Sequence, residues 1–285
     1  MIKNTITAVI IIYNEEKLID RCLLNIKDVV DKIMIFHDGE CKDESLEIAR
    51  KYTDEIFVLK HKGHIEAHLI RALSMVQTEW VLVLDADEYL SDDLKRNLRK
   101  LIESQKVDAY SFLEPIYIPE KNKYTYDVTP RRKIPLLRLS KMYYIGIIHQ
   151  GCSSYGKVLN TDYILEHRPL VFNFTFRSYQ KKWLKLAKIH AESYFKKWEE
   201  IPKFNYNDSD IRKTLKEKFK FNYPLFAIFP VFFSNLFKLL KIGKLNKKFA
   251  YVFAILESLY AASVCYYIFK FKIKSKKDKK EKIKK

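Results

Sequence analysis

The sequence predicts an α/β protein with a mostly parallel sheet flanked by helices, followed by a helical, apolar extension. Three observations support this fold class. Short apolar runs alternate with amphipathic stretches over the first hundred residues, as in parallel sheets that are covered on both faces. Carboxylates cluster where these runs end, at one edge of the predicted sheet. Lysines gather instead near the C-terminus, beside two long apolar segments.

The first half is predicted to form four strands with helices between them. The strands are rich in β-branched and aromatic residues, and we place them at residues 8–13, 32–36, 55–59 and 80–84. Helices are indicated by apolar residues that share one face, namely Leu18, Cys22 and Ile26, and then Ile65, Leu69, Leu73 and Val76. Ser91 is placed to cap a further helix that runs to about Ile102.

The second half is predicted to complete the sheet and then to become helical. Strand-like pieces at residues 109–113 and 134–139 are separated by prolines. A basic amphipathic helix is expected over residues 177–198, before apolar segments at 223–237 and 249–269. We therefore divide the chain into a globular domain (1–175), an apolar membrane-associating region (176–270) and a lysine-rich tail (271–285).

Composition narrows the function classes. The chain has 285 residues and a net charge of +18, and the excess is concentrated in a tail with ten lysines from Lys270 to Lys285. No aromatic and basic residues interleave as in a nucleic-acid module, so no nucleic-acid partner is predicted. The four cysteines lie far apart and no secretory signal is visible, which favours a reducing, cytoplasmic compartment.

The residues after three of the four strands are polar or acidic. Ligands of parallel α/β sheets sit outside the carboxyl ends of the strands, so Glu15, Asp38, Asp85 and Asp87 are expected at one rim. Asp85 and Asp87 are two apart in a segment taken as extended, which would point both carboxylates to one side. Two such charges about 4 Å apart repel by roughly 4 kcal/mol at an effective dielectric of 20. A Mg²⁺ or Mn²⁺ ion would relieve this repulsion. The alternative is that Asp85 caps a helix and Asp87 is only solvated.

Three segments together resemble glycosyltransferase family 2, whose members have the Rossmann-like GT-A fold. They are residues 7–15 (TAVIIIYNE), 38–43 (DGECKD) and 80–88 (WVLVLDADE). The resemblance implies a nucleotide-sugar donor and a divalent cation, with Asp85 on ribose or metal and Asp87 ligating the metal under the diphosphate. It also implies a donor pocket, and the residues that we expect to bind the nucleotide sugar are Ile11, Tyr13, Glu15, Asp38, Asp85 and Ala86. Two departures concern the base pocket: many members have proline where Ile11 stands, and serine where Glu40 or Cys41 stands.

A fourth segment, residues 146–150 (GIIHQ), is similar to the Gly-x-x-His-Glu segment of members that act on cell-surface polysaccharide and lipid-linked sugars. His149 is therefore a candidate metal or diphosphate ligand, although a structural histidine is an equal alternative. Gln150 replaces the glutamate, which argues against an acid-base role there. Among the other histidines, only His68 is expected to open toward the rim.

The reaction expected from these residues is a single displacement that inverts the anomeric centre. The metal would neutralise the departing nucleoside diphosphate, and a carboxylate would take the proton of the acceptor hydroxyl. The candidate catalytic residues are Asp87, Glu114, Asp127 and His149, with Glu114 and Asp127 as alternative bases. The expected acceptor is a membrane-associated saccharide or lipid-linked sugar. A non-catalytic membrane-bound scaffold and a nucleotidyltransferase are the alternatives, although the glycine-rich loop of the latter is missing.

The apolar C-terminal segments predict an association with an anionic membrane surface. Residues 249–269 are long enough to span a bilayer. Lysines lie on both sides of this segment, however, so either a single span or a hairpin would export a basic stretch. We therefore expect helices in the interface at the cytoplasmic face. A buried helical hairpin with a charged tail is the alternative.

Overall fold

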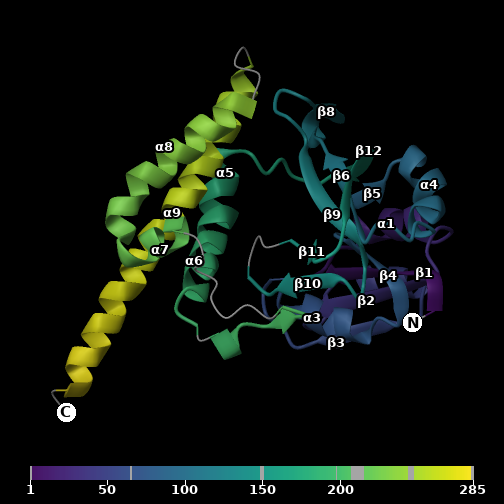
Figure 1. Cartoon of the computed structure of the whole chain (residues 1–285), viewed down its shortest axis with the longest axis horizontal. Helices are drawn as coiled ribbons and strands as arrows, with labels where there is room; N and C mark the ends of the chain where they lie inside the picture. Colours follow the sequence, from purple (N-terminus) through teal and green to yellow (C-terminus); the bar gives the residue numbers. More distant parts are fainter. Residues whose placement is uncertain are drawn as a thin grey trace. The chain divides into compact units, whose positions relative to one another are not determined.

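The computed structural model describes residues 2–64, 66–147, 151–196, 198–206, 215–242 and 247–283. The chain divides into two compact units. The sheet unit comprises Met1–Tyr126, Pro130–Leu170 and Pro202–Tyr206. The helical unit comprises Asp127–Thr129, Val171–Ile201 and Asn207–Lys285. Figure 1 shows the elements of both units along the chain.

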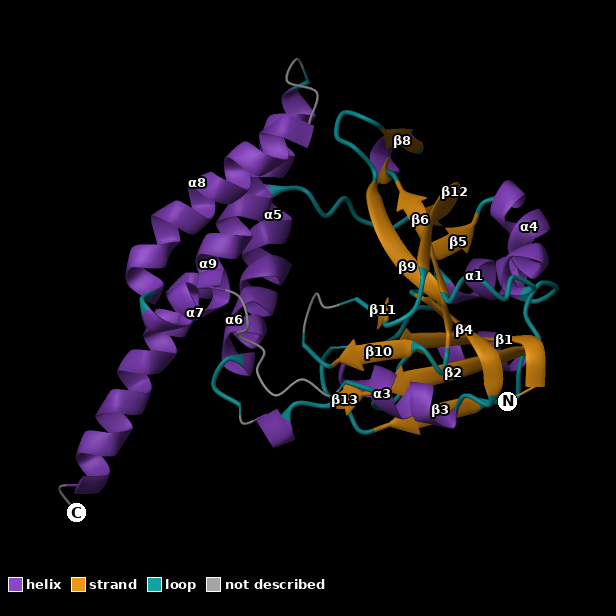
Figure 2. Ribbon diagram, in the orientation of Figure 1, coloured by secondary structure: helices purple, strands orange, loops and turns teal. Residues whose placement is uncertain are grey.

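The sheet unit is built on a central sheet that has eight strands among the described residues, in the order β3-β2-β1-β4-β9-β6-β12-β5 (Figure 2). Four successive strands are parallel neighbours, β12 is parallel to β6, and β9 runs antiparallel between β4 and β6. The expected mostly parallel sheet is therefore confirmed. The strands are β1 (Ile2–Ile12), β2 (Lys32–Asp38), β3 (Ile56–Leu59), β4 (Thr78–Leu84), β5 (Glu88–Leu90), β6 (Ala109–Glu114), β9 (Arg131–Arg138) and β12 (Val158–His167).

Helices cover both faces of the sheet because the strand side chains alternate between two cores. From β1, Ile10 and Ile12 pack in the core with α1 (Ile19–Ile26), α2 (Ser45–Arg50) and α4 (Asp92–Ile102). Val9 and Ile11 point to the other core, with α3 (Glu66–Met75). The predicted cap of α4 is present, since the Ser91 hydroxyl accepts from the Leu94 N–H at 3.3 Å. These cores fix the carboxyl ends of β1, β2 and β4 at one edge of the sheet.

Smaller elements surround this sheet. A hairpin joins β7 (Ile116–Ile118) to β8 (Lys123–Thr125), with the short helix η1 (Pro119–Lys121) at its tip. A second small sheet has the order β11-β10-β13, from β10 (Met142–Ile145), β11 (Ser153–Ser154) and β13 (Lys203–Phe204).

The helical unit contains the basic amphipathic segment and both apolar segments. Its elements are α5 (Phe176–Ser178), η2 (Tyr179–Trp183), α6 (Leu184–Ser193), η3 (Trp198–Glu200), α7 (Leu215–Asn222), α8 (Pro224–Ile242) and α9 (Lys248–Ile283). Two stretches, Pro224–Lys241 and Lys248–Lys276, are long and apolar enough to cross a membrane by length and composition. The described part of the lysine-rich tail continues α9 as far as Ile283.

The single helix expected over residues 177–198 is wrong in detail. The path is helical but contains the wider π-type turn η2, and it ends at Ser193. Within η2 the Tyr179 hydroxyl lies 2.5 Å from the Ser263 hydroxyl of α9. Periodicity along one helix carries no information about this contact, which joins residues 84 positions apart.

Candidate active site

The turn after β4 carries both predicted metal-binding aspartates. The Asp85 N–H donates to the Glu88 carboxylate at 2.9 Å, and the Glu88 N–H donates to the Asp85 carbonyl at 3.0 Å. Ala86 and Asp87 form the turn between these two residues. The expectation that Asp85 and Asp87 alternate along an extended segment is therefore wrong, because the reciprocal bonds fold the chain back at this point.

Each aspartate carboxylate has its own cationic partner. Lys133 of β9 places its Nζ 3.1 Å from Asp85 Oδ2 and 2.5 Å from Glu88 Oε1. The Glu88 side chain is only 2% exposed, and burial raises its pKa to about 7, against the opposing effect of Lys133. Burial alone would lower the pKa of Lys133, but Asp85 and Glu88 outweigh it and raise that pKa. Lys133 therefore stays charged and holds the base of the turn.

Asp87 is bonded to a histidine from the far end of the domain. His167, the last residue of β12, places Nε2 3.1 Å from Asp87 Oδ2 and Nδ1 3.2 Å from Glu114 Oε1. Burial would lower the pKa of His167, but its bonds with Asp87 and Glu114 raise it well above its ordinary value. In turn, burial would raise the pKa of Glu114, but the bond with His167 lowers it. The raised pKa of His167 favours a ring that donates from both nitrogens, to Asp87 and to Glu114.

These side chains form one cluster at the carboxyl ends of β4 and β6. Charges on Asp85, Glu114, Lys133 and His167 all act on the buried carboxyl of Glu88. The backbone joins the same elements, because Glu88 of β5 pairs in register with His167 of β12. In addition, the Arg168 N–H donates to the Asp87 carbonyl at 2.8 Å. We call this set, Asp85, Asp87, Glu88, Glu114, Lys133 and His167, the acidic cluster.

The acidic cluster offers suitable ligands for a hard divalent ion. Asp85 and Asp87 supply carboxylate oxygens, which are the ligands that hard divalent ions prefer. Among the described residues, no three His, Cys, Asp or Glu side chains converge as a ready-made metal cage. Such a cage is not required, since Mg²⁺ and similar ions are often held by one or two carboxylates together with substrate phosphates. The residues present therefore fit a divalent ion.

Asp38 is buried and organises the loop that faces it. Its Oδ1 accepts from the Lys62 N–H at 2.6 Å and lies 2.7 Å from His68 Nε2, while its Oδ2 accepts from the Gly63 N–H at 2.9 Å. Burial would raise the pKa of Asp38, but these bonds outweigh it and lower the pKa. His68, the histidine expected at the rim, is buried as the partner of this carboxylate. Contact of Asp38 with a nucleotide base stays a prediction.

The other residues predicted to bind the nucleotide sugar differ in how they can contribute. Tyr13 is 43% exposed, and its ring centroid lies 5.1 Å from that of His61, so an aromatic surface is open at the end of β1. Glu15 lies nearby and its N–H donates to the Ser45 hydroxyl. Ile11 and Ala86 are buried, which limits them to shaping the site.

Two predicted catalytic residues are not brought into the acidic cluster. Asp127 is assigned to the helical unit, with Val128 and Thr129. His149 lies outside the described residues. Of the two alternative bases, the structure therefore brings only Glu114 to Asp87, through His167. Two arginines of β9 have partners within the sheet unit: Arg138 is bonded to Glu79 and Ser104, and Arg132 donates to the Thr161 carbonyl.

Sequence reasoning missed Lys133, His167 and the part played by Glu88. Lys133 directly precedes the apolar run of β9, and His167 ends the strand-like run Tyr163, Ile164, Leu165. A charged or imidazole group at the boundary of an apolar strand is the signal that was available. Nothing local indicates that both would meet the turn after β4.

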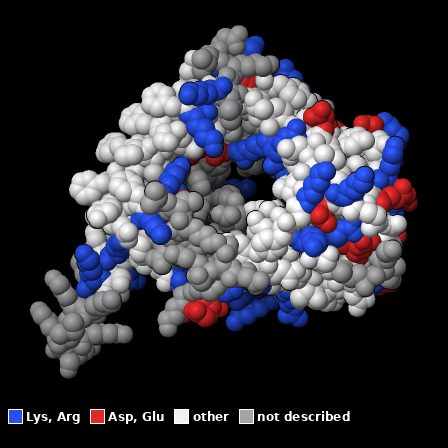
Figure 3. Space-filling model, viewed as in Figure 1, with Lys and Arg blue, Asp and Glu red and all other residues white. Residues whose placement is uncertain are grey.

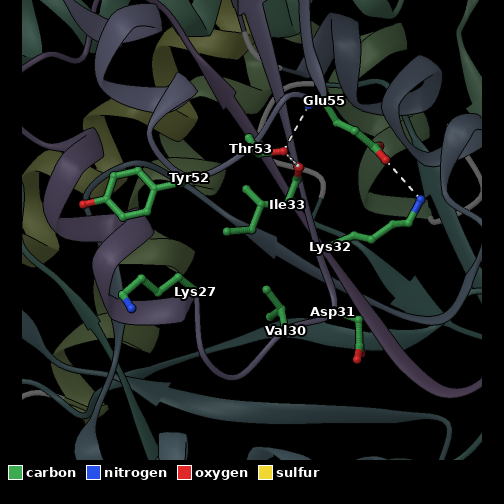
Figure 4. A pocket seen from close by; sticks show the side chains of 8 residues that line it. All are labelled: Lys27, Val30, Asp31, Lys32, Ile33, Tyr52, Thr53 and Glu55. Carbon is green, nitrogen blue, oxygen red and sulfur yellow. Dashed lines mark hydrogen bonds and ion pairs between the residues drawn. The ribbon is translucent and has the colours of Figure 1, made fainter.

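A separate open pocket lies at the opposite edge of the sheet. It has a volume of about 210 Å³ beside the start of β2, and Figure 4 shows Lys32 in it, bonded to Glu55. The lining residues are Lys27, Val30, Asp31, Lys32, Ile33, Tyr52, Thr53 and Glu55. Because the pocket lies at the amino ends of β2 and β3, it is not part of the acidic cluster.

Part of the chain is similar to proteins named as glycosyltransferases. An uncharacterized glycosyltransferase of Rickettsia prowazekii is 27% identical over 168 residues, which cover 59% of this chain and 53% of the relative. The SPbeta prophage-derived glycosyltransferase SunS of Bacillus subtilis is 27% identical over 164 residues, covering 56% of this chain and 38% of SunS. The matched part of the chain thus spans about half of the length of the first relative and a smaller share of SunS.

A solved structure also matches, with a low overall score. It is glucosyl-3-phosphoglycerate synthase from Mycobacterium tuberculosis in complex with Mn²⁺ and uridine-diphosphate-glucose, with a TM-score of 0.33 and 17% identity over 39% of this chain and 43% of the synthase. Residues 7–164, more than half of the chain, match the family described as glycosyl transferase family 2. The protein therefore belongs to glycosyl transferase family 2.

Proposed function

We propose that the protein is an inverting, metal-dependent glycosyltransferase that moves a sugar from a nucleotide-sugar donor to a membrane-associated saccharide or lipid-linked acceptor. The observation that most supports this proposal is that His167 bonds both Asp87 and Glu114 at the carboxyl ends of the strands. The family to which the chain belongs adds to that support. Relatives named as glycosyltransferases support the reaction class. The two long apolar helices support work at a membrane, which we place at its cytoplasmic face.

Asp85 and Asp87 would hold the divalent ion, with His167 beside Asp87 and with His149 as a further predicted ligand. When bound, the ion supplies a positive charge that stabilises the departing nucleoside diphosphate. Lys133 keeps Asp85 in place and lowers the net negative charge where a diphosphate has to approach. The exposed ring of Tyr13 offers a surface on which a nucleotide base can stack.

Glu114 is the base that we favour among the described residues. His167 keeps its carboxylate ionised, so Glu114 can accept a hydrogen bond from an acceptor hydroxyl and then its proton. Attack from the face opposite the leaving group inverts the anomeric centre. Asp127 remains the alternative base.

The test is the binding of nucleoside diphosphates to the full chain with and without Mn²⁺, measured by calorimetry for uridine and guanosine diphosphate. We expect binding that depends on the metal and is lost in Asp87→Asn, because that variant removes a carboxylate charge. Hydrolysis of a panel of nucleotide sugars would then identify the donor.

Asp28→Asn is the matched control, since it also removes one aspartate charge but from an exposed side chain, which pairs with its neighbour Lys27. It should bind as the parent does. If Asp87→Asn binds the diphosphate as tightly as the parent, in the presence and absence of Mn²⁺, the proposal is wrong.

A further inference from the structure

We infer that α8 lies in the plane of an anionic lipid bilayer surface, with one phenylalanine-rich face inserted among the lipids. This inference rests on the membrane association proposed above and names the surface responsible for it. It does not depend on the transfer reaction.

The exposed face of α8 is built from its largest apolar side chains. Four phenylalanines spaced by three, four and four residues lie on one side of the helix. Their exposed fractions are 74% for Phe226, 69% for Phe229, 47% for Phe233 and 62% for Phe237. The small residues Ala227 and Val231 are buried instead, against Cys265 of α9. A helix adapted to water has the reverse arrangement, with its large apolar residues inside. We call the four phenylalanines the phenylalanine face.

The longer apolar helix, α9, packs against two neighbouring helices along its middle. Val264 and Ile268 pack against Ala187 and Ala191 of α6. The Tyr260 hydroxyl lies 3.2 Å from His190 Nδ1, also on α6. The other side of α9 packs on α8. Within the described part of the helical unit, the middle of α9 is therefore packed on two sides, by α6 and by α8.

Helix α6 carries charges that are incompatible with the centre of a bilayer. Lys185, Lys188 and Glu192 belong to this helix. If α9 spanned the membrane with α6 packed on its middle, these side chains would be carried toward the hydrocarbon core, where ionised groups are costly. An orientation in the interface avoids this cost, because only the phenylalanine face then leaves water.

The charges around the phenylalanine face identify the partner as an anionic bilayer. The sequence from Pro224 to Phe237 contains no ionised residue. Figure 3 shows uncharged side chains along the edge of the molecule where Figure 1 labels α8. Lysines flank this stretch on both sides, namely Lys216, Lys218 and Lys220 on α7, and Lys238, Lys241, Lys247 and Lys248 after it. An apolar face between basic ends matches the acyl and headgroup layers of anionic lipid.

The experiment is co-sedimentation of the full chain with vesicles of phosphatidylcholine alone or mixed with phosphatidylglycerol. We expect stronger binding to the anionic vesicles. In Phe226→Gln/Phe229→Gln/Phe233→Gln, binding should fall on the order of 100-fold, because three rings no longer leave water. The matched control is Leu24→Gln/Val58→Gln, which changes two similarly exposed apolar residues of the sheet unit and should bind as the parent does.

Depth measurements distinguish an interfacial helix from a spanning one. Phe226→Trp, Phe233→Trp and Phe237→Trp are compared for quenching by lipids brominated at different acyl positions, after subtraction of the parent signal. A helix in the interface places all three positions at one depth. A deeper middle position would show a spanning helix and would overturn the inference.

The remaining outcomes separate this inference from the proposals on which it rests. If the parent binds vesicles and the glutamine variant binds equally well, the phenylalanine face is not the contact, although membrane association stands. If the parent binds neither kind of vesicle, both fail, while diphosphate binding still tests the transfer reaction. If the parent instead dimerises without lipid and the glutamine variant is monomeric, the face is an interface between copies and the inference is wrong.

Discussion

Replacing Lys133 by methionine tests whether the acidic cluster depends on the cation that pairs with its buried carboxylate, Glu88. The change keeps the side-chain length but leaves Glu88, which is almost fully buried, without the ammonium at 2.5 Å. Removing one partner of a buried pair costs roughly 3–5 kcal/mol. Lys133 keeps 29% of its side chain exposed, so water can partly replace it, and we expect a loss of about 3 kcal/mol at pH 8.

The loss of unfolding free energy should depend on pH, because an unpaired Glu88 can bind a proton and become neutral. The unfolded carboxyl has a pKa near 4.3, and keeping it protonated costs about 1.4 kcal/mol for each pH unit above that value. At pH 5.5 the destabilisation therefore cannot exceed about 1–2 kcal/mol. Urea denaturation of the full chain at pH 8 and pH 5.5, followed by far-UV circular dichroism, measures both values.

A double-mutant cycle with Glu88→Gln makes the prediction specific. In Lys133→Met/Glu88→Gln no buried charge is left unpaired, and the glutamine oxygen can still accept from the Asp85 N–H. We expect the double variant to recover most of the loss at pH 8. Lys27→Met, which breaks an exposed pair with Asp28, should cost less than about 1 kcal/mol. Additive losses in the double variant, or an equal loss at both pH values, would refute the reasoning.

Three further predictions concern single positions. Gly39→Ala should lower the free energy of unfolding, measured by urea denaturation, by about 1–3 kcal/mol, because φ is +96° and an added Cβ would lie 2.8 Å from the His61 Cβ. Gly151→Ala, which has open space around its added Cβ, should leave that free energy unchanged. Asp38→Asn should flatten the acid side of the stability profile, since the lowered pKa of Asp38 gives stability that is present above the ordinary aspartate pKa and lost as pH falls; unchanged acid unfolding would contradict this. His167→Gln should flatten the alkaline side of the same stability profile. The raised pKa of His167 gives stability that is complete below the ordinary histidine pKa and is lost as pH rises. If the stability difference between parent and variant instead grows from pH 6.5 to pH 9, the prediction is wrong.

Much of the fold follows from local patterns in the sequence. Apolar runs predicted β1 to β4, and the Ser91 cap predicted the start of α4. These features depend on neighbours within one strand or one turn of helix, so the sequence contains the needed information. The π-type turn at Tyr179 was not predictable in this way, since it accompanies a contact with Ser263 in another helix.

From the sequence, only those site residues could be predicted that lie close together along the chain. Asp85 and Asp87 were found because they follow a strand, but the spacing of two residues fits a strand and a tight turn equally well. Their cationic partners lie 48 and 80 residues away, on β9 and β12. Which strand crosses beside the aspartate turn depends on the strand order, and no motif in the sequence specifies that order.

The link between Asp87 and the end of β12 also affects how the domain can be divided. Similarity to the family ends at residue 164, yet His167 and the Arg168 N–H both bind Asp87. A fragment that ends at residue 164 would keep Asp85 and Asp87 but would lose His167 and Arg168, which bond Asp87. During synthesis, likewise, the aspartate turn emerges from the ribosome about 80 residues before His167, so the acidic cluster cannot form until that strand is made.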